Sequence, residues 1–207
     1  KSPFVKYWLH TAFLTIDGKK MSKSLENFYT VSDVEKKDFD PLALRYLYLG
    51  AHYRDPLNFT WDSLQAAQSA LIKIKNQISN LKNADRTILS TEKNEKVDKF
   101  RNEFMESVND DLNTPKALAV LWEVLGSNIP STDKYDLAML FDEVLGLKLG
   151  ESKEIEIPKE VKKMIAERKK LREKGDFAAS DVIRDKIVSS GFSIEDTPQG
   201  PTIKPLK

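Results

Sequence analysis

Apolar residues recur every three or four positions through residues 61 to 147, a spacing typical of helices that each bury one face. The first run predicts one long helix, and the later runs predict three more. The positions are, in chain order, Leu64, Ala67, Leu71, Ile74, Ile78 and Leu81; Val97, Phe100, Phe104 and Val108; Leu118, Leu121, Trp122 and Leu125; and Leu137, Leu140, Phe141, Val144 and Leu145. Because such faces must pack against one another, an all-α bundle with short connections is expected.

Start and stop residues support these helices. Asp40-Pro41 is a good helix start, because Asp accepts hydrogen bonds from the first amides and Pro fits the first turn. Asn113-Thr114-Pro115 predicts a second start. Gly126 and Gly146 predict helix ends.

The first 30 residues follow a different pattern. Residues 7 to 16 alternate loosely between apolar and polar and lead to Asp17-Gly18, a strong turn signal. We expect a strand, a tight turn and an exposed loop from Lys19 to Asn27. The chain is expected to become helical near residues 30 to 33.

The last part of the chain predicts a small α+β module. Residues 148 to 157 are polar and charged, which indicates a linker that ends at Pro158. Asp176 is a plausible N-cap and Gly191 a natural helix end. The predicted elements are helices at about 158 to 174 and 176 to 190, and short strands at 192 to 195 and 202 to 204 around a turn at 197 to 200.

Composition excludes several classes of site and partner. Lys and Arg number 33 against 32 Asp and Glu, so a nucleic-acid partner must be argued from local clusters. The chain has no Cys and only His10 and His52, so neither a disulfide nor a zinc site made wholly from these residues is expected. No apolar run approaches the roughly 20 residues that span a bilayer, and a cytoplasmic protein is expected. The start at Lys1 suggests a fragment.

One local cluster stands out in this nearly neutral chain. Residues 159 to 174 hold eight Lys or Arg and three Glu. A basic helix of this kind suits a phosphate backbone, although charge runs are more often solvated faces.

The loop after the Asp17-Gly18 turn carries the clearest chemistry. Lys19, Lys20 and Lys23 stand there with Ser22 and Ser24. When a carboxylate attacks the α-phosphate of ATP, negative charge builds on the departing pyrophosphate, and a placed lysine stabilises that charge. A solvated Lys/Ser-rich turn is the alternative for a bare cluster of lysines.

The identity of residues 20 to 24 makes the interpretation specific, because Lys-Met-Ser-Lys-Ser (KMSKS) is the signature loop of class I aminoacyl-tRNA synthetases. Other segments resemble the cysteinyl member in order along essentially the whole chain. They are Tyr7-Trp8-Leu9-His10, Phe13-Leu14, Ser24-Leu25, Asn27-Phe28, Ala51-His52-Tyr53-Arg54, Pro56-Leu57-Asn58-Phe59, Asn109 to Pro115 and Glu195 to Gly200. The chain therefore resembles the C-terminal half of a cysteinyl-tRNA synthetase.

This resemblance implies a mostly α protein that begins with the end of a Rossmann-like catalytic domain. The implied domains are residues 1–30, the edge of the catalytic domain with the signature loop; 31–84, a linking helical region; 85–150, a helical bundle; and 151–207, a small anticodon-binding module.

The resemblance also implies roles for individual residues. Lys23 is expected to contact the ATP phosphates and the pyrophosphate, with Lys20 as second choice and Met21 as an anchor. The ATP-binding set is Lys20, Met21, Ser22, Lys23 and Ser24. The anticodon-binding set is Arg172, Phe177, Asp181 and Asp196, residue types suited to stacking on bases and hydrogen bonding to their edges.

Two departures from the family pattern bear on these roles. Glu26 stands where relatives usually have Gly, which adds a negative charge to a loop meant to hold an anion. Phe177 stands where many have Trp, and its alternative place is the core of the second helix.

Other polar residues allow two interpretations each. Trp8 and His10, on the expected strand, lie either in the core or near the nucleotide. Residues 52 to 54 either cap a helix end or belong to a surface that supports the loop or meets the tRNA. Asp110 and Asp111 are interpreted as carboxylates stabilised near a helix N-terminus, and a metal cluster there is rejected.

The implied function is ATP-dependent activation of cysteine to cysteinyl-AMP and its transfer to tRNA(Cys). ATP would enter with Mg²⁺, and a zinc site would lie upstream of this chain, with no metal site within it. The complete enzyme is expected to be a monomer. The alternatives are a noncatalytic tRNA-binding module and a synthetase-like ligase that joins cysteine to an amino sugar; residues 158 to 204 argue against the latter.

Overall fold

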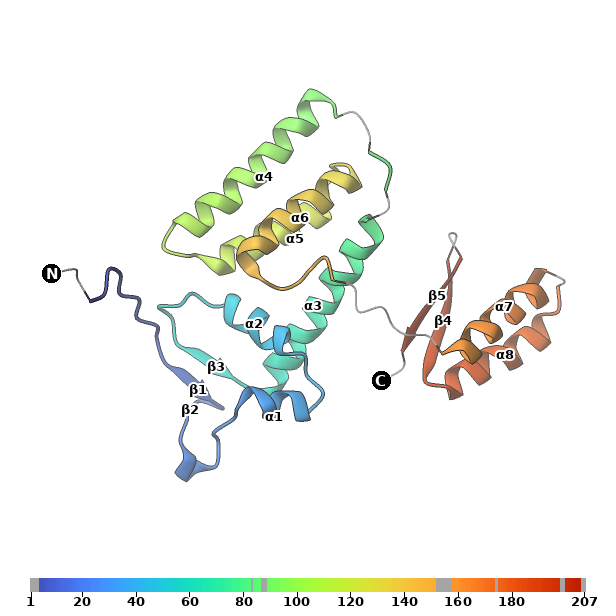
Figure 1. Cartoon of the computed structure of the whole chain (residues 1–207), viewed down its shortest axis with the longest axis horizontal. Helices are drawn as coiled ribbons and strands as arrows, with labels where there is room; N and C mark the ends of the chain where they lie inside the picture. Colours follow the sequence, from blue (N-terminus) through green and yellow to red (C-terminus); the bar gives the residue numbers. More distant parts are fainter. Residues whose placement is uncertain are drawn as a thin grey trace. The chain divides into compact units, whose positions relative to one another are not determined.

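The computed structural model describes residues 4–82, 84–86, 89–151, 158–173, 175–197 and 200–205. The chain divides into two compact units, Lys1–Ser152 and Lys153–Lys207, and each is described by itself (Figure 1). Within the described ranges, no helix is long and apolar enough to cross a membrane. The predominance of helix is confirmed, whereas the Rossmann-like character of the first residues and the four-domain layout stay predictions.

The first unit begins with a small sheet. Its strands are β1 (Leu14–Ile16), β2 (Lys19–Lys20) and β3 (Leu57–Phe59), in the order β2-β1-β3. β1 pairs antiparallel with β2 and parallel with β3. The predicted strand, turn and loop are thus present, but the strand is much shorter than expected.

The predicted placement of Trp8 and His10 on that strand is wrong. The chain before β1 is not a strand, and Trp8 is 75% exposed. The rings of Trp8 and His10 stack on each other with their centroids 6.0 Å apart. Backbone hydrogen bonds tie the end of this segment to the rest of the unit, from the amide of Ala12 to the carbonyl of Tyr53 at 2.8 Å and from the amide of Leu57 to the carbonyl of Phe13 at 3.1 Å.

Short helices complete the first region. Thr30 caps α1 (Val31–Lys36) through a reciprocal exchange of hydrogen bonds with Asp33. Asp40 caps α2 (Pro41–Leu49), as the sequence predicts. The small core beneath the sheet consists of Ile16, Val34, Ala43, Leu44, Phe59 and Leu64.

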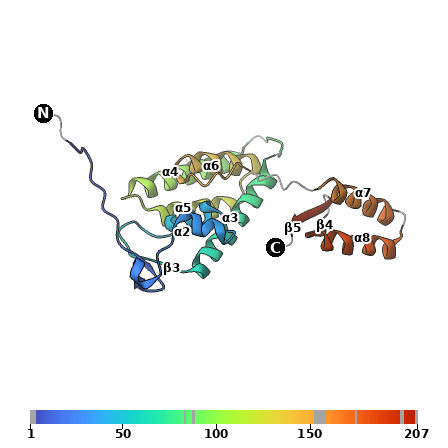
Figure 2. The same cartoon turned by 60° about the horizontal axis from the view of Figure 1, so that its bottom comes forward.

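The predicted helical bundle is confirmed (Figure 2). Its helices are α3 (Trp61–Leu81), α4 (Thr91–Asn109), α5 (Thr114–Gly126) and α6 (Ser131–Leu145). At its centre the rings of Phe104 and Phe141 stack with centroids 3.9 Å apart. Leu140 and Val144 are 36% and 44% exposed, so their predicted place in the α6 stripe is wrong.

The chain after α6 also corrects the prediction of a linker from Lys148. Leu147 and Leu149 are buried in the bundle core. Their amides donate to the two carboxylate oxygens of Asp142, each at 2.7 Å. The bundle therefore extends at least to Leu149, and residues 152 to 157 lie outside the described ranges.

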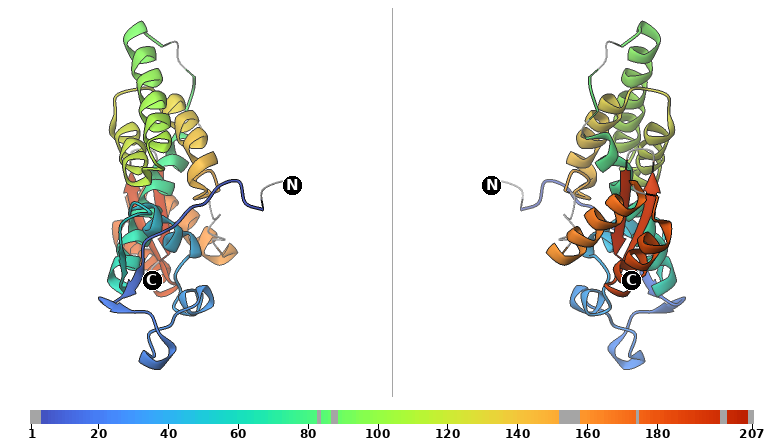
Figure 3. Two further views of the ribbon diagram at one scale, coloured as in Figure 1. Left: turned by 90° about the vertical axis from the view of Figure 1, so that its left-hand side faces the viewer. Right: turned by 90° about the vertical axis from the view of Figure 1, so that its right-hand side faces the viewer.

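The second unit has the predicted order of elements. The helices α7 (Lys159–Glu173) and α8 (Phe177–Ser189) lie on one side of the hairpin of β4 (Phe192–Thr197) and β5 (Gly200–Pro205) (Figure 3). Asp176 caps α8, as expected. The core consists of Val161, Ile183, Ile187 and Ile194. The predicted turn includes residues 198 and 199, which lie outside the described ranges.

Candidate functional site

The signature loop begins on a hairpin whose turn is fixed from a distant strand. Asp17 and Gly18 have φ of 49° and 72°, which suits a tight hairpin turn. The side-chain oxygen of Asn58, on β3, accepts from the Gly18 amide at 2.7 Å and from the Thr15 hydroxyl at 3.0 Å. The Asp17 amide donates to the Phe59 carbonyl at 3.0 Å. β3 therefore sets where the loop leaves the sheet.

The loop itself closes on one side chain, Asn27. Its amide nitrogen donates to the carbonyl of Lys20 at 3.1 Å, and its oxygen accepts from the amide of Ser22 at 2.8 Å. Ser22 in turn caps a 3₁₀ turn at Lys23–Leu25, with its hydroxyl accepting from the amide of Ser24 at 3.2 Å. The loop has internal order, and Asn27 ties both of its ends together.

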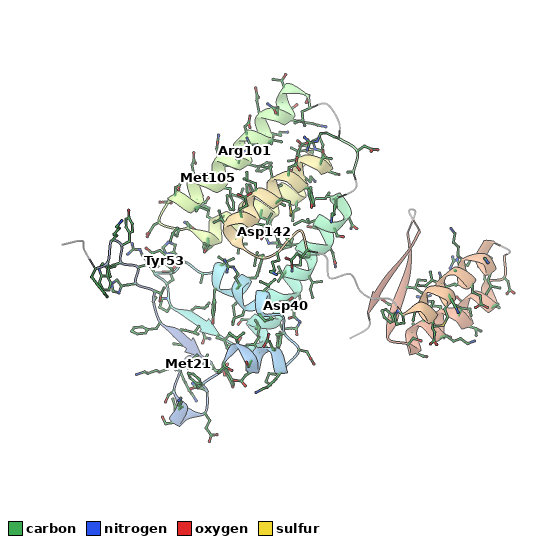
Figure 4. All side chains as sticks on the ribbon, viewed as in Figure 1. Met21, Asp40, Tyr53, Arg101, Met105 and Asp142 are labelled. Atoms are coloured by element: carbon green, nitrogen blue, oxygen red, sulfur yellow. The ribbon has the colours of Figure 1, made fainter. Side chains whose placement is uncertain are left out.

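The side chains of the loop divide into an anchor and exposed cations. Met21 is half-buried and packs against the small core (Figure 4), a position suited to the anchor role that stays a prediction. Lys20 and Lys23 are exposed. The Lys23 ammonium lies 5.8 Å from the ring centroid of Phe28. The loop therefore presents ammonium groups to solvent from a packed base, an arrangement suited to a polyphosphate.

Glu26 adopts the conformation that favours glycine. Its φ is 51° and its ψ is 23°, in the left-handed region. Glycine at this position would reach this backbone without a Cβ penalty. The departure at Glu26 thus concerns backbone strain as well as charge.

A second cluster of polar side chains joins the segment after α2 to the turn between α4 and α5. Its centre is Asp111, and its member Tyr53 is labelled in Figure 4. Arg54 donates to the Asp111 carboxylate from Nε at 2.6 Å and from Nη2 at 3.1 Å, and the Tyr53 hydroxyl donates to it at 2.5 Å. The Arg54 amide donates to Nδ1 of His52, so Nε2 carries the proton and donates to the Asp111 carbonyl at 2.9 Å.

These contacts change the proton affinities within the cluster. The hydrogen bonds from Arg54 and Tyr53 lower the pKa of Asp111 to about 2. The hydrogen bond to Asp111 raises the pKa of Tyr53 above its ordinary value. The interpretation of Asp111 as a carboxylate near a helix N-terminus missed these partners, which lie 57 to 59 positions away in the chain. Asn113, by contrast, caps α5 as predicted.

A largely apolar cavity of about 410 Å³ lies beside this cluster. Residues from four stretches of the first unit line it: 9 to 14, the end of α2, 51 to 57, and the α4–α5 turn. His52 and Tyr53 line this cavity and also form hydrogen bonds with Asp111. Leu112, which follows Asp111 in the chain, lines the cavity too. No local pattern could indicate this cavity, because its walls come from stretches that lie far apart in the chain.

The predicted anticodon residues lie in the second unit. The Arg172 guanidinium carbon lies 5.9 Å from the ring centroid of Phe177, across the α7–α8 turn. Phe177 is 60% exposed, so the alternative placement in the core is wrong. Asp181 is exposed on α8, one turn after Phe177. Asp196 lies on β4, and its side chain is outside what the structure describes.

Family models match two parts of the chain. Residues 1–69, which include the signature loop and residues 52 to 54, match the model described as tRNA synthetases class I (C) catalytic domain. Residues 103–127, which include Asp111 and α5, match the DALR domain. The contact between Arg54 and Asp111 therefore joins the two matched regions.

Curated relatives match almost the whole chain. A cysteine–tRNA ligase 1 of Burkholderia lata is 40% identical over 197 residues, which are 94% of this chain and 40% of the relative. Cysteine–tRNA ligases of Lachnospira eligens and Chlamydia felis are 35% and 37% identical over 96% and 99% of this chain, and each is covered to 45%. The chain spans less than half the length of these relatives. Over almost its whole length the chain is therefore similar to part of the cysteinyl-tRNA synthetases, and it matches a class I (C) catalytic domain and a DALR domain.

Proposed function

We propose that this chain supplies the ATP-phosphate loop and the tRNA-binding parts of an enzyme that ligates cysteine to tRNA(Cys). The observation that carries the proposal is the loop Lys20 to Ser24, closed by Asn27 and presenting exposed ammonium groups from a packed base. The similarity to cysteine–tRNA ligases over nearly the whole chain supports the choice of amino acid.

In the proposed reaction the carboxylate of cysteine attacks the α-phosphate of Mg²⁺-bound ATP, and the bond to the bridging oxygen of pyrophosphate breaks. The Lys23 ammonium neutralises charge on the departing pyrophosphate, and Lys20 assists. Because this charge is larger in the transition state than in bound ATP, the interaction accelerates the step. The Ser22 and Ser24 hydroxyls, 2.7 Å apart, are suited to hydrogen bonds with phosphate oxygens.

The proposal assigns no residue of this chain to zinc. In the described ranges no group of three or more His, Asp or Glu is arranged to hold a metal ion. The described residues therefore offer no zinc ligand set, and the proposed reaction uses none of them to hold zinc. The upstream zinc site and the monomeric state of the complete enzyme stay predictions.

The exposed apolar side chains before β1 support the idea that further polypeptide completes the catalytic domain. Phe4, Tyr7, Trp8 and Phe13 are 102%, 90%, 75% and 84% exposed. Such a concentration of apolar surface is characteristic of an interaction site. The relatives carry more than half of their length outside the matched region, which is enough chain to cover this segment.

Cysteine-dependent exchange of pyrophosphate into ATP tests the ligase. We expect none from this chain alone, and exchange when the chain is joined to the N-terminal part of the Burkholderia lata ligase. Lys23→Ala in the joined enzyme should lower the exchange rate about 100-fold or more. Lys36→Ala, which removes an exposed lysine that pairs with Asp33 on α1, is the matched control and should change the exchange rate little. Exchange by the chain alone, or equal losses in both variants, would contradict the proposal.

The second unit is proposed to bind the anticodon loop through Arg172, Phe177, Asp181 and Asp196. Exposed Phe177 beside Arg172 offers a face on which an unpaired base can stack, and stacking contributes about 1–3 kcal/mol per base. Phe177→Ala should therefore weaken tRNA binding about ten-fold in a filter-binding titration. Arg184→Ala, at an exposed position of the same helix, is the control.

A second candidate function is a noncatalytic tRNA-binding module. The compact second unit with its basic helix α7 favours it, since this unit needs no ATP loop to meet a phosphate backbone. Binding of tRNA by the chain, combined with no exchange from the joined enzyme, would support this candidate over the ligase.

A further inference from the structure

The turn between α4 and α5 holds an unusual backbone. Asp111 and Leu112, both with a Cβ, have φ of 52° and 55° in succession. Neighbouring left-handed residues of this kind persist only where surrounding contacts hold them. Here the amides of Leu112 and Asn113 donate back to the end of α4, and residues 52 to 54 bind the side-chain carboxylate and the backbone carbonyl of Asp111.

Residues 52 to 54, which bind Asp111, are connected to the signature loop through β3. From Arg54 four residues of chain reach Asn58, and the amide of Leu57 on the way donates to the Phe13 carbonyl at 3.1 Å. Asn58 then fixes Gly18 and Thr15, and Phe59 fixes Asp17, as described above. Each step is either a hydrogen bond of at most 3.1 Å or a short run of consecutive residues, so a shift of Arg54 has a direct route to the Asp17-Gly18 turn.

The hydrogen bonds to Asp111 fix the positions of Tyr53 and Arg54. Arg54 makes a bidentate contact with the carboxylate, which fixes orientation as well as distance. Tyr53 shares the same carboxylate, and its ring lies 5.1 Å from the Arg54 guanidinium carbon. Asp110, the neighbouring exposed carboxylate, makes none of these contacts.

We propose that Asp111 is a positioning residue for the loop Lys20 to Ser24, and that it acts through Arg54 and Asn58. The bundle region that matches the DALR domain thereby sets the conformation of a loop in the region that matches the catalytic domain. The consequence for adenylate formation rests on the proposed function, whereas the structural link does not.

Hydrogen exchange of the whole chain tests the link without ATP, cysteine or tRNA. Asp111→Asn should accelerate amide exchange about ten-fold in residues 52 to 59 and in residues 14 to 22, and should leave the buried amides of α3 and α5 unchanged. Asp110→Asn is the matched control, because it removes the same charge one position away. Arg54→Gln should reproduce the pattern, and the double variant Arg54→Gln/Asp111→Asn should add little to either change.

Two results would overturn the proposal. One is exchange in residues 14 to 22 of Asp111→Asn that equals that of Asp110→Asn, because the link would then end before the loop. The other is an acceleration of the same size in α3 and α5, because it would indicate a general loss of stability. Since no ligand is present, neither result depends on whether the complete protein is a ligase.

In the joined enzyme, Asp111→Asn distinguishes a residue that positions the ATP loop from one that contacts the substrate. Asp111→Asn should lower the kcat of pyrophosphate exchange more than it changes the KM for cysteine, because the ATP loop is displaced and the amino-acid site is not. An unchanged kcat together with accelerated exchange in residues 14 to 22 would contradict the catalytic consequence and leave the structural link in place.

Discussion

The side-chain amide of Asn27 donates a hydrogen bond to the carbonyl of Lys20 at 3.1 Å, across the mouth of the signature loop. Its oxygen accepts from Ser22 at the same time. One planar group thereby fixes the backbone on both sides of Met21. The positions of Lys20 and Lys23 depend on this closure more than on any contact of their own side chains.

Replacing Asn27 should loosen the loop without unfolding the protein. Asn27→Ala removes both hydrogen bonds, each with a net contribution of about 0.5–1.5 kcal/mol, so the Ser22 amide should exchange with solvent at least several-fold faster. Asn27→Asp keeps the acceptor and should have a smaller effect on that amide. Asn102→Ala, at an exposed position on α4, is the control. An unchanged Ser22 amide in Asn27→Ala would contradict the closure.

Glu26→Gly should stabilise the loop. Glycine relieves the left-handed strain of about 1–2 kcal/mol but loses about 0.5–1 kcal/mol to the greater freedom of the unfolded chain, which leaves a net gain of up to about 1.5 kcal/mol. Chemical denaturation of the whole chain measures this change. Glu26→Ala removes the charge and keeps the strain, so it separates the two effects. Glu95→Gly, within the exposed face of α4, should instead destabilise by about 1 kcal/mol.

The ionisation of Tyr53 reports on its contact with Asp111. Because its hydrogen bond to Asp111 raises the pKa of Tyr53 above 10.0, its contribution to stability is complete below pH 10 and is lost as the pH rises through the folded-state pKa. A difference-absorbance titration, with Tyr53→Phe to assign the signal, should show this pKa fall towards its ordinary value in Asp111→Asn. An unchanged pKa would mean that the contact is absent in solution.

The hydrogen bonds of Arg54 and Tyr53 to Asp111 also make the stability of the protein depend on pH in the acid range. The pKa of Asp111 is lowered from 3.8 to about 2, so its contribution to stability is present above about pH 4 and is lost as the pH falls towards 2. Asp33, also lowered to about 2 by its hydrogen bonds with Thr30, titrates in the same window. Acid unfolding of Asp111→Asn and Asp33→Asn should therefore each show a shallower pH dependence between pH 2 and 4 than the parent chain. A slope equal to the parent's in both would contradict these contacts.

Asp142 should contribute strongly to the stability of the end of the first unit. Asp142→Ala leaves the amides of Leu147 and Leu149 without their partner, and a loss of about 3 kcal/mol in the free energy of unfolding is expected for two hydrogen bonds to a charged group. Asp142→Asn keeps one acceptor and should lose about half as much. Glu143→Ala, at the exposed neighbouring position, should change it by less than about 0.5 kcal/mol. Equal losses in Asp142→Ala and Glu143→Ala would refute the role of the carboxylate.

The sequence alone determined the helices, several of their caps and the identity of the signature loop. The period of Leu64 to Ile78 and the caps at Asp40, Asn113 and Asp176 involve residues within about four positions of one another, and the structure confirms them. The loop was identifiable because five consecutive residues carry its chemistry. Such local patterns are legible because hydrogen bonding within a helix or a cap is itself local.

Tertiary structure alone decided which distant residues meet and which side chains are covered. Asp111 and Arg54 are 57 positions apart, so no spacing rule joins them. Leu149, in a stretch that reads as a linker, is buried because Asp142 holds its backbone against the bundle, while Phe177, apolar and at a helix start, is exposed beside Arg172. Burial depends on the surface that neighbouring elements present, and that surface exists only after the chain has folded.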